Sequence, residues 1–581
     1  MTPRTSSISR AYLLLGSATL LAGAIACSAG GAANDSTRTG SSGSGNASGS
    51  GNASGASGSS PTAGSGDVSS GAAPSSIGIT SLLQSCDSSV LGRPQLRRLT
   101  RGELQRSLDD IFPQVKGKWS VSIAEAASAL GFDNDPAVLT VGGQVAGKLL
   151  DTASALASAL VADDALQQLL PCAASTPNHA CAQTFLDQYG RRLFRRPLSQ
   201  AEQGRYLSFF DARLAASDFK SALRWMTVGL VQSPQAIYRR EVGTLSGSEY
   251  QLSQHEIAAE LAYMFTGTTP TAELLAQADM GTLDSPEKLV TLAGQLLATP
   301  AGQDTLQRFF KAWLSYDQLP GSLPNVSSFG AVAPDMVQET QAFIRQVVLE
   351  GRGGPKELLT ASYTTPSRAL ASFYEFPSPS ADYQKVERPS GRGIGVLAQG
   401  SVIAAHSHEA ASSPTLRGLL VFERLLCGQR PQVPANVPTL VTASPGVKTT
   451  RQRYEEQHMS AGSACTSCHK FFDPLGFGFE HYDEAGRYRE QEVGLPIDSS
   501  GNLKDGSTEL FSFSGLDELA RNLSTQEKVG LCSSGYVNAY AFANSVACLG
   551  ETRRSKFVAG KLGFIDYYAS LAAEPSLMRR K

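Results

Sequence analysis

Apolar residues of this chain recur mostly at the spacing of an α-helix. After Thr100, the positions Leu104, Leu108 and Ile111 fall on one helical face, and Pro113 ends the run. Before residue 500, no alternation of apolar and polar residues is long enough to predict a strand. The pattern therefore predicts a mainly α protein, with several helical domains in series.

Three helix starts share one signal, a Ser or Thr followed three residues later by Glu. In such a capping box the hydroxyl accepts from the N3 amide, while the Glu carboxylate accepts from the N-cap amide. A Leu precedes each box, and in two of the three boxes it has the spacing of a hydrophobic staple. The boxes predict helices after Thr100, Ser199 and Ser253, with Glu103, Glu202 and Glu256 at N3.

Later helices are marked by proline and by clustered aromatic residues. Ser285 followed by Pro286 predicts a helix with Pro at its first position. Phe309, Phe310 and Trp313 then define an apolar face, which we expect to lie in the core.

The N-terminal segment has the composition of an export signal. Two arginines precede the apolar stretch Ala11–Ile25, which is too short for a membrane-spanning helix. Cys27 follows a run of small residues, although the Leu usual three positions before it is missing. Residues 1–26 are therefore predicted to be a lipoprotein signal peptide, with Cys27 lipidated. An ordinary secretory peptide is the alternative.

Residues 28–80 consist almost wholly of Gly, Ser, Ala, Asn and Thr. Such a segment buries too little apolar surface to order itself, so it is predicted to be a disordered linker. Together with the lipid, it would tether the folded part to a membrane. We therefore expect an exported outer-membrane or cell-surface lipoprotein, facing the periplasm or the exterior.

Cys465-Thr-Ser-Cys468-His469 has the spacing of a c-type haem attachment site. With nine Cys and seven His in the chain, random placement would give roughly 0.002 such motifs. The thiols of Cys465 and Cys468 would bind the haem covalently, and His469 would be the proximal iron ligand. A second C-x-x-C is missing, which argues against structural zinc. A disulfide or a degenerate haem site remain alternatives.

The other cysteines predict disulfides. Without Cys27 and the two motif cysteines, six of nine remain, and an even number in an exported protein suggests up to three bridges. Fifteen pairings are possible. The simplest pairing has two local bridges, Cys172–Cys181 and Cys532–Cys548, and one long-range bridge, Cys86–Cys427.

Residues around the motif suggest how a haem would be held. The turn at Asp473-Pro474 would place a carbonyl to accept the Nδ1 proton of His469, leaving Nε2 for iron. Arg417, Arg487 and Arg489 are candidates for binding the propionates, since an Arg fork suits a carboxylate. For Arg487 an ion pair within the protein is an equal alternative.

The sixth iron ligand is left open by the sequence. Met578, the only Met after His469, lies in a basic tail that we expect to be frayed. His406 and His408 are the distal candidates, followed by His481, and a vacant sixth position is the alternative. The segment that contains His458 leads into the proximal side and is not expected to reach the distal one.

Several motifs resemble those of an uncharacterised family of exported bacterial proteins, in which consecutive domains of unknown function accompany a C-terminal cytochrome-c-like CxxCH module. The motifs are Arg97–Glu103, Gly190–Leu198, Ser233–Arg239, Gly393–Ser401, Ser413–Gly418 and the C-x-x-C-H itself. The resemblance implies this domain order and little about activity. The predicted domains are N-terminal helical (90–165), small helical (172–243), helical (250–380), cytochrome-c-like (388–492) and C-terminal helical (505–578).

Three functions follow from these features. The first is an exported, membrane-tethered protein with one haem c that transfers electrons to an unknown redox partner. The second is a haem-dependent peroxidase or oxidase outside the cytoplasm, so whether the protein is an enzyme stays open. The third is a non-enzymatic surface protein that binds polysaccharide or partner proteins. A net charge of −2 gives no reason to expect nucleic acid as a partner.

Overall fold

The computed structural model describes residues 82–83, 90–125, 128, 130–431, 447–460, 463–543 and 551–581. Apart from Pro431, these residues belong to one compact unit. The predicted signal peptide, the lipidation site Cys27 and the linker 28–80 lie outside the described residues, as do Cys86 and Cys548. Among the described helices, none is long and apolar enough to span a membrane by itself; one pair, Gly143–Leu160 with Asp163–Leu169, passes together but is bent by 84°.

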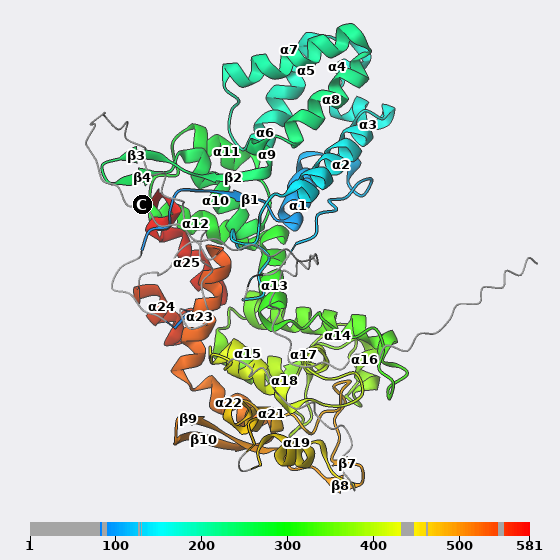
Figure 1. The fold of residues 1–581 in the computed structure, drawn as a ribbon, viewed down its shortest axis with the longest axis vertical. Coiled ribbons are helices and arrows are strands. Elements are labelled where there is room, and N and C mark those ends of the chain that lie inside the picture. The colour runs from blue at the N-terminus through cyan, green and yellow to red at the C-terminus, as the bar shows by residue number, and fades with distance from the viewer. Residues whose placement is uncertain are drawn as a thin grey trace, which may run out of the picture. The chain divides into compact units, whose positions relative to one another are not determined.

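The protein is mainly helical, as predicted, with short antiparallel strands (Figure 1). The first part of the described chain consists of β1 (Gln95–Arg98), α1 (Arg101–Ile111), α2 (Gly143–Leu160), α3 (Asp163–Leu169), α4 (Cys172–Ser175), α5 (His179–Phe185), α6 (Arg191–Phe194), α7 (Gln200–Ala216), α8 (Phe219–Val231), α9 (Pro234–Ile237) and β2 (Tyr238–Glu241). Strand β2 pairs antiparallel with β1, which places Gln95 opposite Glu241.

The middle part is helical with short strand pairs. It consists of β3 (Thr244–Ser246), β4 (Glu249–Gln251), α10 (Gln254–Thr266), α11 (Ala272–Asp279), α12 (Pro286–Ala298), α13 (Pro300–Leu314), α14 (Phe329–Ile344), α15 (Pro355–Thr360), β5 (Tyr363–Thr364), α16 (Arg368–Phe373) and β6 (Val386–Glu387).

The last part contains the C-x-x-C-H motif and the C-terminal helices. It consists of α17 (Gly400–Ala405), α18 (Pro414–Leu419), α19 (Thr450–His458), α20 (Thr466–His469), α21 (Asp473–Phe477), β7 (Gln491–Glu492), β8 (Leu495–Pro496), β9 (Ser500–Asp505), β10 (Thr508–Ser514), α22 (Gly515–Ser524), α23 (Glu527–Ala541), α24 (Glu551–Val558), α25 (Phe564–Ser570) and β11 (Arg579–Arg580).

The three predicted capping boxes are confirmed. Thr100, Ser199 and Ser253 are the N-caps of α1, α7 and α10, and each box makes both of its hydrogen bonds. Pro286 is the first residue of α12, with Ser285 as its N-cap. These local signals are reliable because the groups that must pair are only three residues apart.

Two large hydrophobic cores account for most of the buried apolar residues. The first draws on residues 99–237 and includes Tyr263 from α10. The second extends from α10 to the C-terminal helices and includes the predicted core residues Phe309, Phe310 and Trp313. Segments 250–380, 388–492 and 505–578 therefore contribute to one shared core, and packing does not stop at the ends of the predicted domains.

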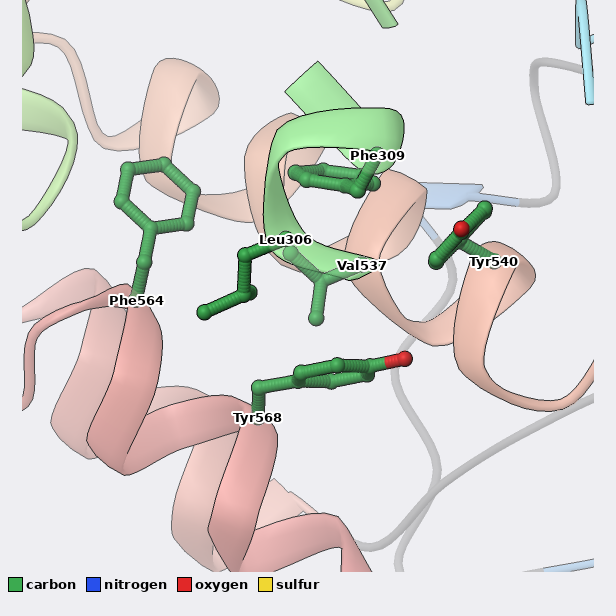
Figure 2. Close-up of a pocket in the computed structure, with 6 residues that line it drawn as sticks. All are labelled: Leu306, Phe309, Val537, Tyr540, Phe564 and Tyr568. Atoms are coloured by element: carbon green, nitrogen blue, oxygen red, sulfur yellow. The ribbon is translucent and has the colours of Figure 1, made fainter. Parts of the chain in front are cut away.

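Aromatic side chains join helices from distant parts of the sequence in the second core. Figure 2 shows side chains of α13, α23 and α25 facing one another, with Phe309 beside Tyr540 and Tyr568 below them. The Tyr568 hydroxyl donates to the Met264 carbonyl at 2.7 Å, which satisfies its only polar group in the core. The space between these side chains is too small to admit a water molecule, so it is a packing feature and no ligand site.

The predicted C-terminal helical domain begins with a strand. Strand β10 forms an antiparallel hairpin with β9, and the two are the longest strands among the described residues. Leu503 and Phe513 point into the core, whereas most of their neighbours are exposed. This alternation is the period of a strand with one buried face.

The C-terminal tail is ordered, which corrects the expectation that it is frayed. Strand β11 pairs with β4, and the Leu252 amide donates to the Met578 carbonyl at 2.9 Å. Met578 packs against the second core. The tail is held because its last arginine, Arg580, is buried among charged groups.

One of the predicted disulfides is confirmed and two are wrong. Cys172 and Cys181 are bonded as predicted. Cys427 is bonded to Cys532, which excludes both the Cys532–Cys548 and the Cys86–Cys427 pairing. The predicted pairing assumed that Cys532 closes a short loop. Instead, α23 packs against the helical turn Leu420–Leu425 and so brings together two cysteines that are 105 residues apart. Closing a loop of that length stabilises the fold by about 4–5 kcal/mol in the chain-entropy account.

A buried cluster of arginines and glutamates joins β1, β2, α10 and β11. Arg97 and Arg580 both contact Glu241, at 3.1 and 2.9 Å, and Arg239 contacts Glu260 at 2.8 Å. All five side chains are at most 4% exposed. Burial alone would raise the pKa of Glu241, but the three guanidiniums hold this pKa well below its usual value. Breaking such a pair leaves an uncompensated buried charge.

We expect Arg580→Ala to lower the free energy of unfolding by about 3–5 kcal/mol, because it leaves the Glu241 carboxylate without one of its buried partners. Urea-induced unfolding followed by circular dichroism measures the change. Arg579→Ala is the matched control, since Arg579 is 40% exposed and pairs with Glu249. That substitution should cost less than about 1 kcal/mol. Equal losses in the two variants would contradict the assignment.

Candidate functional site

The C-x-x-C-H motif forms one short helical turn. Cys465 is the residue before α20, and its carbonyl accepts from the amides of Cys468 and His469 at 3.1 and 3.0 Å. Residues three apart in a helical turn lie on the same side, so this turn brings the two cysteines together. Both are free thiols and both are half-buried. They do not form the disulfide that was one alternative.

His469 donates toward a carboxylate on the next helix. Its Nδ1 lies 3.0 Å from Oδ2 of Asp473, and the side chain of Asp473 is fully buried. The sequence predicted an acceptor for this nitrogen in the Asp473-Pro474 turn, but expected a backbone carbonyl. The acceptor does belong to this turn, but it is the side-chain oxygen of Asp473 and not a backbone carbonyl, because Asp473 follows His469 by one helical turn.

A second histidine shares the same carboxylate oxygen. Nδ1 of His458 lies 2.8 Å from Oδ2 of Asp473, and the centroids of the His458 and His469 rings are 3.8 Å apart. Thr415 donates its hydroxyl to the other oxygen at 2.7 Å. Burial alone would raise the pKa of Asp473, but the hydrogen bonds from His458 and His469 hold it below its usual value. The carboxylate is therefore ionised at neutral pH and acts only as an acceptor.

Two glycines allow α18 and α21 to meet backbone against backbone. A Cβ atom on Gly418 would lie 1.9 Å from the Phe472 carbonyl oxygen, and one on Gly476 would lie 1.8 Å from the Pro414 carbonyl oxygen. No side chain fits at either position. This close approach places Thr415 of α18 next to Asp473 of α21, so the glycines fix the position of the carboxylate.

Arg417 of α18 binds the backbone of the segment that follows α21. Its terminal nitrogens donate to the carbonyls of Tyr482 and Asp483 at 2.8 and 2.7 Å, and to that of Phe479 at 3.1 Å. The side chain is fully buried, and burial lowers its pKa to about 10, which still leaves it charged at neutral pH. Arg417 is thus held inside the protein by these carbonyls, and its contact with a propionate stays a prediction.

The other two propionate candidates already have partners. Nε of Arg487 lies 2.8 Å from Oδ2 of Asp483, the internal ion pair that the sequence left as an alternative. Arg489 contacts Glu480 and Glu492 at 3.6 and 3.4 Å. Arg487 is 43% exposed and Arg489 is 21% exposed, so contact of either with a propionate stays a prediction.

The distal candidates are separate from the motif in the described part of the structure. His406, at the end of α17, places Nδ1 2.8 Å from the Val402 carbonyl, and burial lowers its pKa to about 4. His408 is exposed and pairs through its backbone with Ala411. His481 places Nδ1 2.8 Å from the Arg489 carbonyl. Among the described residues, none of the three makes a hydrogen bond, ion pair or ring contact with the C-x-x-C-H residues.

His458, Asp473 and His469 form the one group of described residues whose ligand atoms lie close enough together to hold a metal ion, within 4.8 Å of one another. Cys465 and Cys468 do not join this group. A single zinc ion between the thiols and the imidazole would need all three within coordination distance. In haem c the two thiols bind the porphyrin edge while the imidazole binds the iron. The arrangement of free thiols and anchored imidazole therefore fits haem c better than zinc.

A hollow of about 980 Å³ lies beside the motif, between α19, α21 and the β9–β10 hairpin. Its wall includes Met459, Lys470, Phe471, Phe477 and Phe513. The two cysteines and the histidine of the motif are not among the described residues that line this hollow. The hollow therefore adjoins the candidate site without containing its ligand atoms.

Four family matches follow one another along the chain. Residues 97–162, 181–241, 252–376 and 392–492 match families described as proteins of unknown function, DUF1587, DUF1595, DUF1592 and DUF1588 in that order. No curated protein and no solved structure matches the chain. The chain thus carries four consecutive domains of unknown function, and the C-x-x-C-H motif lies within the last.

Glu480 is a second buried acid of this last domain, besides Asp473. It lies 3.7 Å from Arg417 and 3.6 Å from Arg489, and the Ser412 hydroxyl donates to it at 3.0 Å. Burial nevertheless outweighs both guanidiniums and raises the pKa of Glu480 to about 7, from an ordinary value of 4.5.

This shift predicts a pH-dependent stability. The folded chain keeps the Glu480 proton to a higher pH than the unfolded chain, so the resulting stabilisation is complete below pH 4.5 and is lost as the pH rises through about 7. Between about pH 5 and about pH 8, the free energy of unfolding should fall more in the unsubstituted protein than in Glu480→Gln. Urea unfolding across this range measures it. The exposed Glu490→Gln is the control, and equal slopes in all three proteins would refute the prediction.

Proposed function

We propose that this chain of four consecutive domains of unknown function carries one haem c, attached through Cys465 and Cys468 with His469 as the proximal ligand, and that it transfers electrons. The observation that carries the proposal is the separation of roles within the motif. The two thiols are free and half-buried on one turn, while the His469 imidazole is anchored at Nδ1 to the Asp473 carboxylate.

The residues around the motif suit a redox centre. A carboxylate that accepts the Nδ1 proton leaves Nε2 of His469 with its lone pair, the form that binds iron. Phe472, Leu475, Phe477 and Phe479 are all buried beside the motif and would exclude water on that side. Haem supplies one-electron chemistry when bound, with a potential that the axial ligand and such burial tune.

Export and a lipid anchor remain part of the proposal. The two disulfides, Cys172–Cys181 and Cys427–Cys532, support an oxidising compartment, because such bonds are rare in the cytosol. Haem c is attached outside the cytoplasm as well, so both features favour the same location. The tether through Cys27 would keep the protein at the membrane.

A peroxidase or oxidase is the second function that the motif permits. It would require an open iron site and a nearby acid–base group. His406 is a half-buried candidate for that group, with its Nδ1 proton directed to the Val402 carbonyl, but among the described residues it makes no hydrogen bond, ion pair or ring contact with the C-x-x-C-H residues. We therefore favour electron transfer.

Coexpression of the full chain with a c-type haem maturation system tests the proposal. We expect one haem per chain that survives acid-acetone extraction, with the pyridine haemochrome spectrum of thioether-bound haem. Cys465→Ala and Cys468→Ala should each keep one thioether and so change the haemochrome spectrum, whereas the double variant Cys465→Ala with Cys468→Ala should lose the covalent attachment. A chain without covalent haem under these conditions would refute the proposal.

The double variant Cys172→Ala with Cys181→Ala is the matched control, since it also removes two cysteines and should keep the haem. Electron transfer further predicts a six-coordinate, low-spin spectrum that carbon monoxide and peroxide do not change. A five-coordinate spectrum that reacts with peroxide would favour the peroxidase. If the function is surface binding, the double variant Cys465→Ala with Cys468→Ala should remove the covalent haem and leave that binding intact.

A further inference from the structure

The Asp473 carboxylate has three donors and two of them are imidazoles. Nδ1 of His458 and Nδ1 of His469 lie 2.8 and 3.0 Å from its Oδ2, and the Thr415 hydroxyl lies 2.7 Å from its Oδ1. An ionised carboxylate has no proton to give, so both ring nitrogens must carry theirs. Each neutral imidazole then keeps its lone pair at Nε2.

We propose that Asp473 and His458 are positioning residues for His469: Asp473 fixes its Nδ1–H tautomer, and His458 withdraws part of the carboxylate's charge and so limits how strongly Asp473 polarises the ligand imidazole. The redox part of this inference rests on the proposed haem attachment. The tautomer part concerns only side chains that the structure describes.

Burial makes this sharing effective. The side chains of Asp473 and His458 are 0% and 3% exposed, so water does not compete for the carboxylate. Each hydrogen bond to one oxygen reduces the charge that is available to the others, and the effect is larger where the dielectric constant is low. His458 therefore acts on His469 through Asp473 and needs no contact with iron. Thr415 acts through Asp473 and through its own contact with Nδ1 of His469, at 3.4 Å.

The geometry also shows why His458 is suited to this role and not to that of a second axial ligand. Its ring lies 3.8 Å from that of His469, centroid to centroid, and on the same carboxylate oxygen. It therefore packs against the His469 ring itself and shares its carboxylate, which keeps it on the same side of a bound haem as His469.

The first experiment uses the full chain without haem, labelled with ¹³C at Cδ2 of its seven histidines. The Cδ2 chemical shift distinguishes the two neutral tautomers. We expect His469 and His458 to be entirely Nδ1–H, and His469 to become a mixture of tautomers in Asp473→Asn. A mixed or Nε2–H His469 in the unsubstituted chain would overturn the proposal. This result does not depend on whether haem binds.

The second experiment measures the reduction potential of the haem-loaded chain. Asp473→Asn should raise it, because the imidazole loses its negatively charged partner. His458→Phe keeps a ring in place but removes the competing donor, so it should lower the potential. Thr415→Val should lower it as well. His179→Phe is the control and should leave the potential unchanged, because the Nδ1 of His179 pairs with a carboxylate, Oδ2 of Asp211 at 2.9 Å, outside the candidate site.

Shifts of the same sign in Asp473→Asn and His458→Phe, or no shift in either, would overturn the charge-sharing role. If Asp473→Asn does not fold, the tautomer in the unsubstituted chain and the potentials of His458→Phe and Thr415→Val still decide. Failure of haem to attach would overturn the proposed function alone, because the haem-free measurement would still decide the role of Asp473.

Discussion

A buried guanidinium must have its donors accepted by the protein, and this constraint holds the candidate site together. Arg417 meets it at its two terminal nitrogens, though not at Nε, by binding three carbonyls of the segment after α21, which fixes that segment against α18. Arg195 binds the carbonyls of Gln235 and Tyr238 in the same way. These two arginines of the sequence motifs are therefore internal connections, and the segment next to Asp473 is held by one of them, Arg417.

Local signals in the sequence predicted the local structure well. The capping boxes at Thr100, Ser199 and Ser253 and the Cys172–Cys181 bridge each involve groups fewer than ten residues apart. The Cys427–Cys532 bridge and the position of Arg580 could not be read in this way. They depend on which helices share the second core, and no short pattern in the sequence carries that information.

The candidate site shows the same division. The motif itself and an acceptor near Asp473 were predictable, because His469 and Asp473 are four residues apart and a helical turn brings them together. The same spacing also indicates that the Asp473 side chain is the acceptor, although the sequence led us to expect a backbone carbonyl. His458 and Thr415 gave no such signal. Thr415 reaches Asp473 only because Gly418 and Gly476 let α18 approach α21 without intervening side chains. His458 reaches it from the end of α19.

The cysteines of the last domain and its neighbours require opposite treatment during maturation. Cys427 and Cys532 must be oxidised to each other, whereas Cys465 and Cys468 are thiols in the folded chain. A compartment that oxidises the first pair also oxidises a neighbouring C-x-x-C unless a reductant or a bound partner protects it. The order of assembly is therefore constrained: the motif thiols have to be kept reduced and captured while the long-range bridge closes.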